Sequence, residues 1–242
     1  MRLALLTGGS KGLGFALCGV LAEQEFRILE FSRSAPHAYS VRTDLSSPEG
    51  SLQAVAGALA GLGNEPVEEL LVINNAGTID PVGPASRKPH HALVANLNTN
   101  FTSAILILTE IIKHFQAVPC RKVLANISSG AAQQAYSGWS LYCATKAGLE
   151  HFVRTVALEQ QAELHPFIPI NIDPGLMDTE MQARHLHTSS ESDFPALPQF
   201  LQWKEQGALA PPAKVAAAVY RILGLPSLSY GARYETRNHD GC

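Results

Sequence analysis

Short runs of β-branched and apolar residues alternate with longer stretches of helical periodicity along most of this chain. The runs predict strands at residues 3–7, 27–32, 41–43, 70–74, 122–127, 168–172 and 231–235. The stretches predict helices at about 12–24, 48–62, 90–116, 140–163 and 212–224. Such alternation is typical of parallel sheets with crossover helices. We therefore expect an α/β fold, a single doubly wound (Rossmann) domain over residues 1–242, with a seven-stranded parallel sheet and helices on both faces.

The segment at about 177–207 interrupts this alternation. It contains a polar run over residues 188–193, followed by Pro195 and Pro198, and turn residues of this kind favour irregular structure. We interpret it as a long excursion rather than a regular crossover. Long loops in compact domains often cover ligands, so we expect a substrate loop here; a flexible insertion without function is the alternative.

The composition indicates a globular domain and argues against some classes of binding partner. Hydrophobic residues make up 46% of the 242 residues and charged residues 16%, enough to bury one continuous core. The net charge of −3, without a basic patch, argues against nucleic acid and anionic membranes as partners. The apolar run at residues 3–6 is too short for a signal peptide or a membrane span, so we expect a cytoplasmic protein.

Four cysteines without CxxC pairs or metal-spaced histidines are interpreted as ordinary thiols, and no metal site is expected.

A glycine-rich turn follows the first predicted strand and precedes the first predicted helix. Glycine permits positive φ in a tight turn and lets a pyrophosphate approach backbone N–H groups at the helix N-terminus. A glycine-rich turn alone is weak evidence of a dinucleotide site, but its position between strand and helix strengthens the interpretation. The predicted cofactor contacts in this turn are Gly8, Ser10, Lys11, Gly12, Leu13 and Gly14.

The end of the second predicted strand bears on the choice between NAD and NADP. NAD-preferring enzymes usually place a carboxylate there to bind the ribose 2′-hydroxyl, whereas this chain has Ser32 followed by Arg33. Arg33, with Lys11 from the glycine turn, can neutralise a 2′-phosphate, so we favour NADP(H). Two alternatives stay open: both cations are solvated surface charges, or Glu30 acts as a distant carboxylate in a shifted register.

Tyr142 and Lys146 are spaced i and i+4, so on a helix both project from one face. A nearby cation stabilises a phenolate and lowers a tyrosine pKa from about 10, which suits a proton donor to a carbonyl oxygen. Ser129 ends a predicted strand thirteen residues before Tyr142, and a hydroxyl there can stabilise charge on that oxygen. Ser128 is the less favoured candidate for this role.

Five motifs, in order along nearly the whole chain, resemble those of the short-chain dehydrogenase/reductase family. They are the TGxxxGxG turn, the Asp-Leu pair at 44–45, the Asn-Asn-Ala-Gly segment at 74–77, the Ser…Tyr-x-x-x-Lys interval and the Pro-Gly turn at 174–175. The resemblance implies further cofactor contacts from Asp44, Leu45, Asn75, Ala76, Gly77, Tyr142, Lys146, Pro174, Gly175, Met177 and Thr179.

The same resemblance implies catalysis by Ser129, Tyr142 and Lys146, with an asparagine in a kinked helix that holds a water near the lysine. Asn100 fits this position best, because Asn-Phe-Thr-Ser at 100–103 is similar to the family's segment. Asn96 is the reserve, and Asn98 is a third candidate.

Residues 138–143 and 178–182 are similar to sepiapterin reductases and bacterial benzil reductases within that family. This implies NADPH-dependent reduction of a small-molecule carbonyl, either a vicinal dicarbonyl or a pterin side-chain ketone. Glu235 matches the position of a pterin-anchoring aspartate, one methylene longer. Tyr136, Trp139 and Met177 are predicted walls of the substrate pocket, although Trp139 fits a core position nearly as well.

Three further expectations remain. The resemblance implies a homodimer or homotetramer that pairs its long helices, whose apolar stripe is Phe101, Ile105, Leu108 and Ile112; core packing within one chain explains the same stripe. An alternative function is a nucleotide-binding sensor without catalysis, which we expect to lack the serine, tyrosine or lysine. Another is an NAD(P)-dependent alcohol dehydrogenase of another substrate class.

Overall fold

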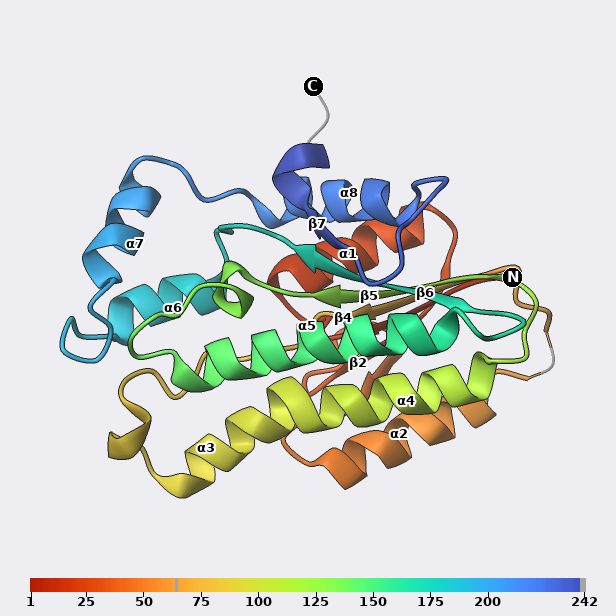
Figure 1. Cartoon of the computed structure of the whole chain (residues 1–242), viewed down its shortest axis with the longest axis horizontal. Helices are drawn as coiled ribbons and strands as arrows, with labels where there is room; N and C mark the ends of the chain where they lie inside the picture. Colours follow the sequence, from red (N-terminus) through yellow and green to blue (C-terminus); the bar gives the residue numbers. More distant parts are fainter. Residues whose placement is uncertain (64, 240–242) are drawn as a thin grey trace.

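The computed structural model describes residues 1–63 and 65–239, and one parallel sheet runs through them (Figure 1). Its spatial order is β3-β2-β1-β4-β5-β6-β7, and every neighbouring pair is parallel. This confirms the predicted seven-stranded doubly wound sheet. The strands are β1 (Arg2–Thr7), β2 (Arg27–Ser32), β3 (Ser40–Arg42), β4 (Glu69–Asn74), β5 (Arg121–Ile127), β6 (Phe167–Asp173) and β7 (Arg233–Glu235).

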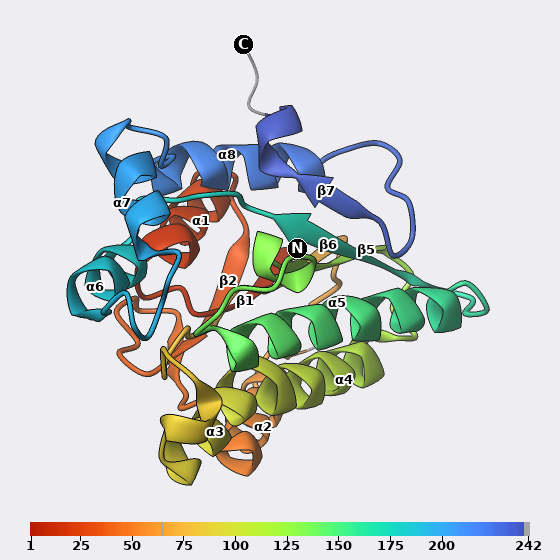
Figure 2. The same cartoon turned by 60° about the vertical axis from the view of Figure 1, so that its left-hand side comes forward.

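Helices cover both faces of the sheet (Figures 1 and 2). One face carries α1 (Gly12–Glu23) and α8 (Pro212–Leu223), whose apolar residues share one buried cluster with the strands. The other carries α2 (Pro48–Ala60), α4 (Ser103–Phe115) and α5 (Ser140–Gln160), which contribute to a second cluster. Strand order reverses between β1 and β4, and ligands of open α/β sheets bind beyond the carboxyl ends of the strands at such a switch point.

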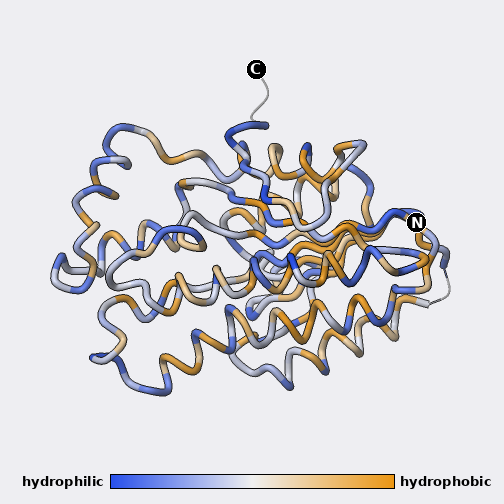
Figure 3. The backbone as a smooth tube through the Cα atoms, viewed as in Figure 1, coloured by the Kyte–Doolittle hydropathy of each residue, from blue (hydrophilic) through white to orange (hydrophobic). Residues whose placement is uncertain are grey.

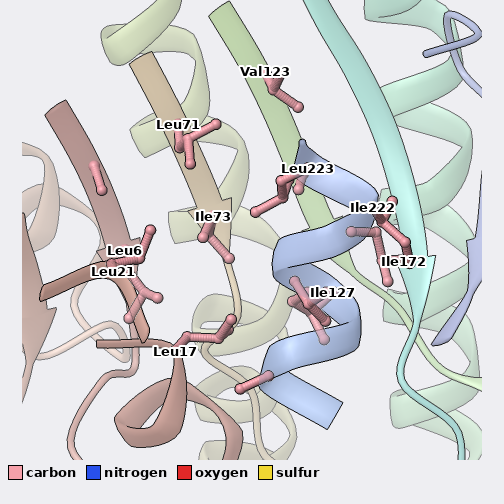
Figure 4. Packing of buried hydrophobic residues seen from close by; sticks show 14 of the residues in the cluster. Leu6, Leu17, Leu21, Leu71, Ile73, Val123, Ile127, Ile172, Ile222 and Leu223 are labelled. Atoms are coloured by element: carbon pink, nitrogen blue, oxygen red, sulfur yellow. The ribbon is translucent and has the colours of Figure 1, made fainter. Parts of the chain in front are cut away.

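The central strands are apolar because both of their faces are covered. Leu3, Ala4, Leu5 and Leu6 of β1 are all at most 1% exposed, and the hydropathy colouring concentrates apolar residues along the sheet (Figure 3). Figure 4 shows side chains of α1 and α8 packed against β4, β5 and β6. Burial of each such Leu or Ile side chain stabilises the folded state by about 1.5–3 kcal/mol. The well-packed sheet therefore holds the carboxyl ends of its strands in fixed positions.

The helix predicted at 90–116 consists of three parts. They are α3 (His90–Leu97), a π-helical segment Asn98–Thr102, and α4, and π segments frequently mark functional sites. The run His90–Phe115 is long and apolar enough to cross a membrane by length and composition, with an 18-residue window of mean hydropathy 1.3. Its side chains Ile107, Leu108 and Ile111 belong to the second core cluster, so the sheet accounts for the apolar face of α4.

The segment 177–207 is more regular than we expected. It forms α6 (Glu180–Thr188) and α7 (Leu197–Glu205), which lie together on the left of Figure 1. The Thr179 hydroxyl accepts the Gln182 N–H at 3.2 Å and caps α6, while Pro198 occupies the first turn of α7. The segment is a long excursion between β6 and α8, as predicted, but the expectation of irregular structure within it was wrong, because these two start signals were present in the sequence.

Candidate active site

One cavity of about 1000 Å³ lies at the carboxyl ends of the strands, and both the predicted cofactor contacts and the predicted catalytic residues line it. The glycine turn and the tyrosine–lysine pair therefore share one space. Of the predicted cofactor, catalytic and substrate residues, all except Asn100 and Glu235 line it, namely Gly8, Ser10, Lys11, Gly12, Leu13, Gly14, Ser32, Arg33, Asp44, Leu45, Asn75, Ala76, Gly77, Ser129, Tyr136, Trp139, Tyr142, Lys146, Pro174, Gly175, Met177 and Thr179.

The glycine turn leaves space that a side chain would fill. A Cβ at Gly8, whose φ is +76°, would lie 2.8 Å from the Ala76 Cα, and one at Gly14 would lie 2.1 Å from the Gly8 carbonyl oxygen. The Asn75 amide donates to the Thr7 and Gly8 carbonyl oxygens at 3.1 and 3.0 Å, which holds the turn in place. This bare backbone at the N-terminus of α1 fits the pyrophosphate of a nicotinamide dinucleotide.

The end of β2 presents Ser32 and Arg33 to the cavity, and Arg33 is exposed. Glu30 is fully buried beneath the glycine turn, where it accepts the Gly9 N–H at 2.8 Å and the Ser32 hydroxyl at 3.1 Å. It does not line the cavity, so the alternative role for Glu30 at the ribose finds no support in this geometry.

Lys11 forms a different contact from the one we expected. Its ammonium pairs with the Glu180 carboxylate of α6 at 2.9 Å, and both side chains are about two-thirds exposed. The pair joins the glycine turn to the segment 177–207 across the cavity mouth. In this conformation Arg33 is the cation presented by the end of β2, and a surface pair such as Lys11–Glu180 is worth only about 0–1 kcal/mol.

One threonine and three asparagine side chains form a buried ladder of hydrogen bonds across the central strands, near their carboxyl ends. The Thr7 hydroxyl donates to the Asn74 oxygen at 3.2 Å, the Asn74 amide to Asn126 at 3.0 Å, and the Asn126 amide to Asn171 at 2.9 Å. Each pair is in direct register across β1, β4, β5 and β6. Satisfied buried polar networks rigidify their surroundings, so this ladder supports the floor of the cavity.

The tyrosine, lysine and serine come together as predicted. Lys146 is 5% exposed, its ammonium lies 5.8 Å from the centre of the Tyr142 ring, and it donates to the Ile127 carbonyl oxygen at 2.8 Å. The Ser129 side chain hydrogen-bonds Tyr142, while the Ser129 Oγ accepts the Ala131 N–H at 3.1 Å. Ser128 instead bonds the buried Glu150 at 2.5 Å, which favours Ser129 over Ser128.

The acidity of Tyr142 differs from the sequence-based expectation. Burial raises the pKa of Tyr142 to about 12, the Ser129 hydrogen bond lowers it, and the charge of Asp173 raises it. We expected the lysine to dominate and lower this pKa, but its ammonium is directed at the Ile127 carbonyl oxygen instead of the phenol. Tyr142 is therefore protonated at neutral pH, as a proton donor must be.

The three candidate asparagines have different environments. Asn100 lies in the π segment, where its amide donates to the Thr78 carbonyl oxygen at 2.7 Å and its oxygen accepts the Thr78 N–H at 2.7 Å. The Asn100 amide also reaches the Thr145 hydroxyl, beside Lys146 in the chain, at 3.4 Å. Asn96 donates to the same Thr78 oxygen, whereas Asn98 bonds Ser46. Asn100 is thus the candidate that contacts α5 next to the lysine.

Aromatic side chains line the substrate end of the cavity. Trp139 stacks on Phe194 at 4.7 Å between ring centres and meets Tyr142 edge-on at 5.5 Å. It is both a cavity wall and part of the buried cluster that joins α6 and α7 to the body. Phe200 and Trp203 of α7 line the cavity as well. We missed them, although their i, i+3 spacing after Pro198 was a readable helical signal.

Glu235 does not line the cavity, so its predicted role as a substrate anchor gains no support from this geometry. Its carboxylate pairs with Arg237 at 2.5 Å, since β7 is a short edge strand followed at once by a turn of 3₁₀ helix. Its register partner on β6, Asp173, lines the cavity instead. The acidic residue near Tyr142 is therefore Asp173, which the sequence interpretation overlooked.

Among the described residues, no group of three His, Cys, Asp or Glu side chains is arranged to hold a metal ion. Cys18, Cys120 and Cys143 are free thiols, and Cys242 lies outside the described residues. Burial raises the pKa of Cys18 to about 11, so this thiol is unreactive at neutral pH.

Comparison with known proteins agrees with this geometry. Residues 2–190 match the family model described as short chain dehydrogenase. The benzil reductase ((S)-benzoin forming) of Bacillus subtilis (strain 168) is 33% identical over 228 residues, which cover 92% of this chain and 93% of that protein. The sepiapterin reductase of Bos taurus is 32% identical and covers 79% of each chain. A short-chain dehydrogenase/reductase structure from Saccharomyces cerevisiae superposes with a TM-score of 0.82 at 23% identity, covering 98% of this chain and 96% of that one.

Proposed function

Because the chain belongs to the short-chain dehydrogenase family, we propose that it is an NADPH-dependent reductase of vicinal dicarbonyls or pterin side-chain ketones. One observation carries the proposal: Ser129, Tyr142 and Lys146 face the same cavity as the glycine turn. The benzil and sepiapterin reductases that resemble this chain suggest the substrate class.

The residues have separate tasks. A bound nicotinamide would supply the hydride to the carbonyl carbon. Tyr142 donates its proton to the carbonyl oxygen, and Ser129 stabilises negative charge on that oxygen through a hydrogen bond. Lys146 stabilises the phenolate left on Tyr142 by its positive charge. Tyr136, Trp139, Phe200 and Trp203 form apolar walls that suit a flat aromatic substrate and exclude water.

The raised pKa of Tyr142 keeps the phenol protonated at neutral pH, which is the form that donates a proton to a carbonyl oxygen. The presence of all three catalytic side chains in one cavity also opposes a sensor without chemistry.

The pH dependence of reduction should follow the protonation of the Lys146 ammonium. Burial lowers the pKa of Lys146 to about 8, and Asp173 raises it, so the ammonium is charged below about pH 8 and neutral above it. We expect kcat/KM to fall as pH rises through about 8, because a neutral amine no longer stabilises the phenolate. The measurement is kcat/KM for the carbonyl between pH 6 and 10. A constant value across that range would contradict the role of Lys146.

The proposed preference for NADPH predicts an effect at Arg33. Arg33→Ala should raise KM for NADPH about tenfold and leave KM for NADH unchanged, because a charge-assisted contact to a 2′-phosphate is worth about 1.5–3 kcal/mol, less where exposed. Arg42→Ala, which removes an exposed arginine outside the cavity lining, is the matched control. A wild-type KM for NADH equal to or below that for NADPH would reverse the assignment.

The substrate assignment is tested with a panel. NADPH oxidation is measured with benzil, sepiapterin, simple diketones and aldehydes at saturating cofactor. We expect the highest kcat/KM for a dicarbonyl or for sepiapterin, because the aromatic walls bind flat substrates. Failure to reduce any member of the panel would overturn the proposed reductase.

The proposal of a homodimer or homotetramer rests on exposed apolar residues. Val94 and Leu97 of α3 are 53% and 38% exposed, and Leu158 of α5 is 69% exposed. Leu108, in contrast, is buried in the core, so part of the predicted stripe serves the single chain.

A further inference from the structure

Arg233 connects the carboxyl ends of three strands with α5. It lies on β7, and its side chain is 15% exposed. One nitrogen pairs with the Glu150 carboxylate of α5, and the other donates to the Asp173 Oδ2 at 2.6 Å and to the Ser129 carbonyl oxygen at 3.2 Å. A single guanidinium therefore holds the backbone of Ser129 and a carboxylate of the cavity wall.

The buried charges around Arg233 balance. Tyr142, Lys146 and Glu150 are spaced i, i+4 and i+8, so they follow one face of α5. The side chains of Glu150 and Asp173 are 5% and 15% exposed, and these two negative charges stand against the two positive charges of Arg233 and Lys146. Balance matters because a buried charge without a partner costs several kcal/mol.

Lys146 lacks a contact ion pair within this network. Across residues 1–63 and 65–239, no carboxylate lies within 4 Å of its ammonium, which instead donates to the backbone carbonyl oxygen of Ile127. The titratable groups that face it are Tyr142 of its own helix and Asp173 of β6, and β5 presents the Ile127 carbonyl oxygen. Arg233 of β7 contacts Asp173, and the carboxylates of Glu150 and Glu235 belong to the same charge network at one remove from the ammonium.

Asp173 is the carboxylate of this set that lines the cavity beside Lys146. Its orientation is constrained twice, by Arg233 and by the Gly175 N–H, which donates to Oδ1 at 3.0 Å. Glu150 is held by Ser128 and Arg233 and does not line the cavity, and Glu235 pairs with Arg237. The electrostatic coupling is mutual: Asp173 raises the pKa of Lys146, and Lys146 lowers that of Asp173.

We propose that Asp173, held by Arg233, is a positioning residue that serves as the counter-charge of Lys146, and that Arg233 also fixes the strand end that carries Ser129. The catalytic consequence rests on the proposed reductase function. Asp173 thereby sets the upper pH limit of the reaction. The strand β7 contributes to catalysis through Arg233, which contacts Asp173 and the Ser129 backbone, and not through Glu235.

The test is Asp173→Asn, which preserves size and can still accept from Arg233. Without the negative charge, the Lys146 ammonium should lose its proton roughly one pH unit lower. We expect the alkaline limb of kcat/KM for NADPH-dependent benzil reduction to shift by that amount, with a less than about threefold change near pH 6. The 13Cε resonance of Lys146, assigned through Lys146→Arg, should shift its titration equally in the cofactor-free protein.

Two further variants separate charge from structure. Arg27→Met removes an arginine, 45% exposed, that pairs with Glu65 at the start of β2 and lies outside this network, and it should leave the Lys146 titration unchanged. Arg233→Lys keeps the charge but loses the two-pronged contact, so it should lower kcat several-fold with little shift of the pH limb. An unchanged Lys146 titration in Asp173→Asn overturns the inference. If the wild type reduces no carbonyl, the proposed function fails, while the resonance still decides whether Asp173 is the counter-charge.

Discussion

Tyr142→Phe should lower the turnover of carbonyl reduction roughly 10²–10⁴-fold, the usual worth of positioned acid–base catalysis, while NADPH binding is retained. The variant removes only the hydroxyl that Ser129 bonds and leaves the ring packed edge-on against Trp139. Turnover is measured at saturating NADPH and benzil, and NADPH affinity by fluorescence titration.

Tyr220→Phe is the control for this prediction. Its phenol lies on α8, outside the cavity, and donates to Gln24 at 3.3 Å, so its removal should leave turnover within about twofold. Near-normal turnover in Tyr142→Phe would exclude Tyr142 as the proton donor.

Gly14→Ala should weaken both the fold and the cofactor site. The new Cβ would lie 2.1 Å from the Gly8 carbonyl oxygen and 2.5 Å from the Asn75 amide nitrogen, and a backbone atom cannot rotate away. Overpacking of this kind costs about 1–3 kcal/mol or more, and displacement of the turn should raise the Kd for NADPH more than tenfold. Thermal unfolding and fluorescence titration measure the two effects.

Gly19→Ala provides a matched control on the same helix. No atom lies within 4 Å of a Cβ at Gly19, and alanine is favoured over glycine inside a helix by about 0.5–1 kcal/mol. We expect equal or higher stability and unchanged NADPH affinity. Equal losses in both variants would mean that the close contact at Gly14 is not the cause of the effect.

The sequence was sufficient for the sheet and for the main helices because the signals for these elements are local. Runs buried on both faces must be apolar, so the strands, their parallel arrangement and the order of the main helices could be predicted from residue patterns. The glycine turn and the Tyr142–Lys146 spacing are local too, since a turn and an i, i+4 pair determine their own geometry. The cavity unites these two motifs as expected.

Only the tertiary structure decided the charges around the chemistry. The burial that raises the pKa of Tyr142, the exclusion of Glu235 from the cavity and the placement of Asp173 depend on contacts between distant segments. Arg233 pairs with Glu150, which lies 83 positions earlier in the chain, and no local pattern of residues predicts such a contact. Local patterns determine which elements form and which side chains share a face, whereas desolvation and charge pairing depend on what the rest of the chain places around each group.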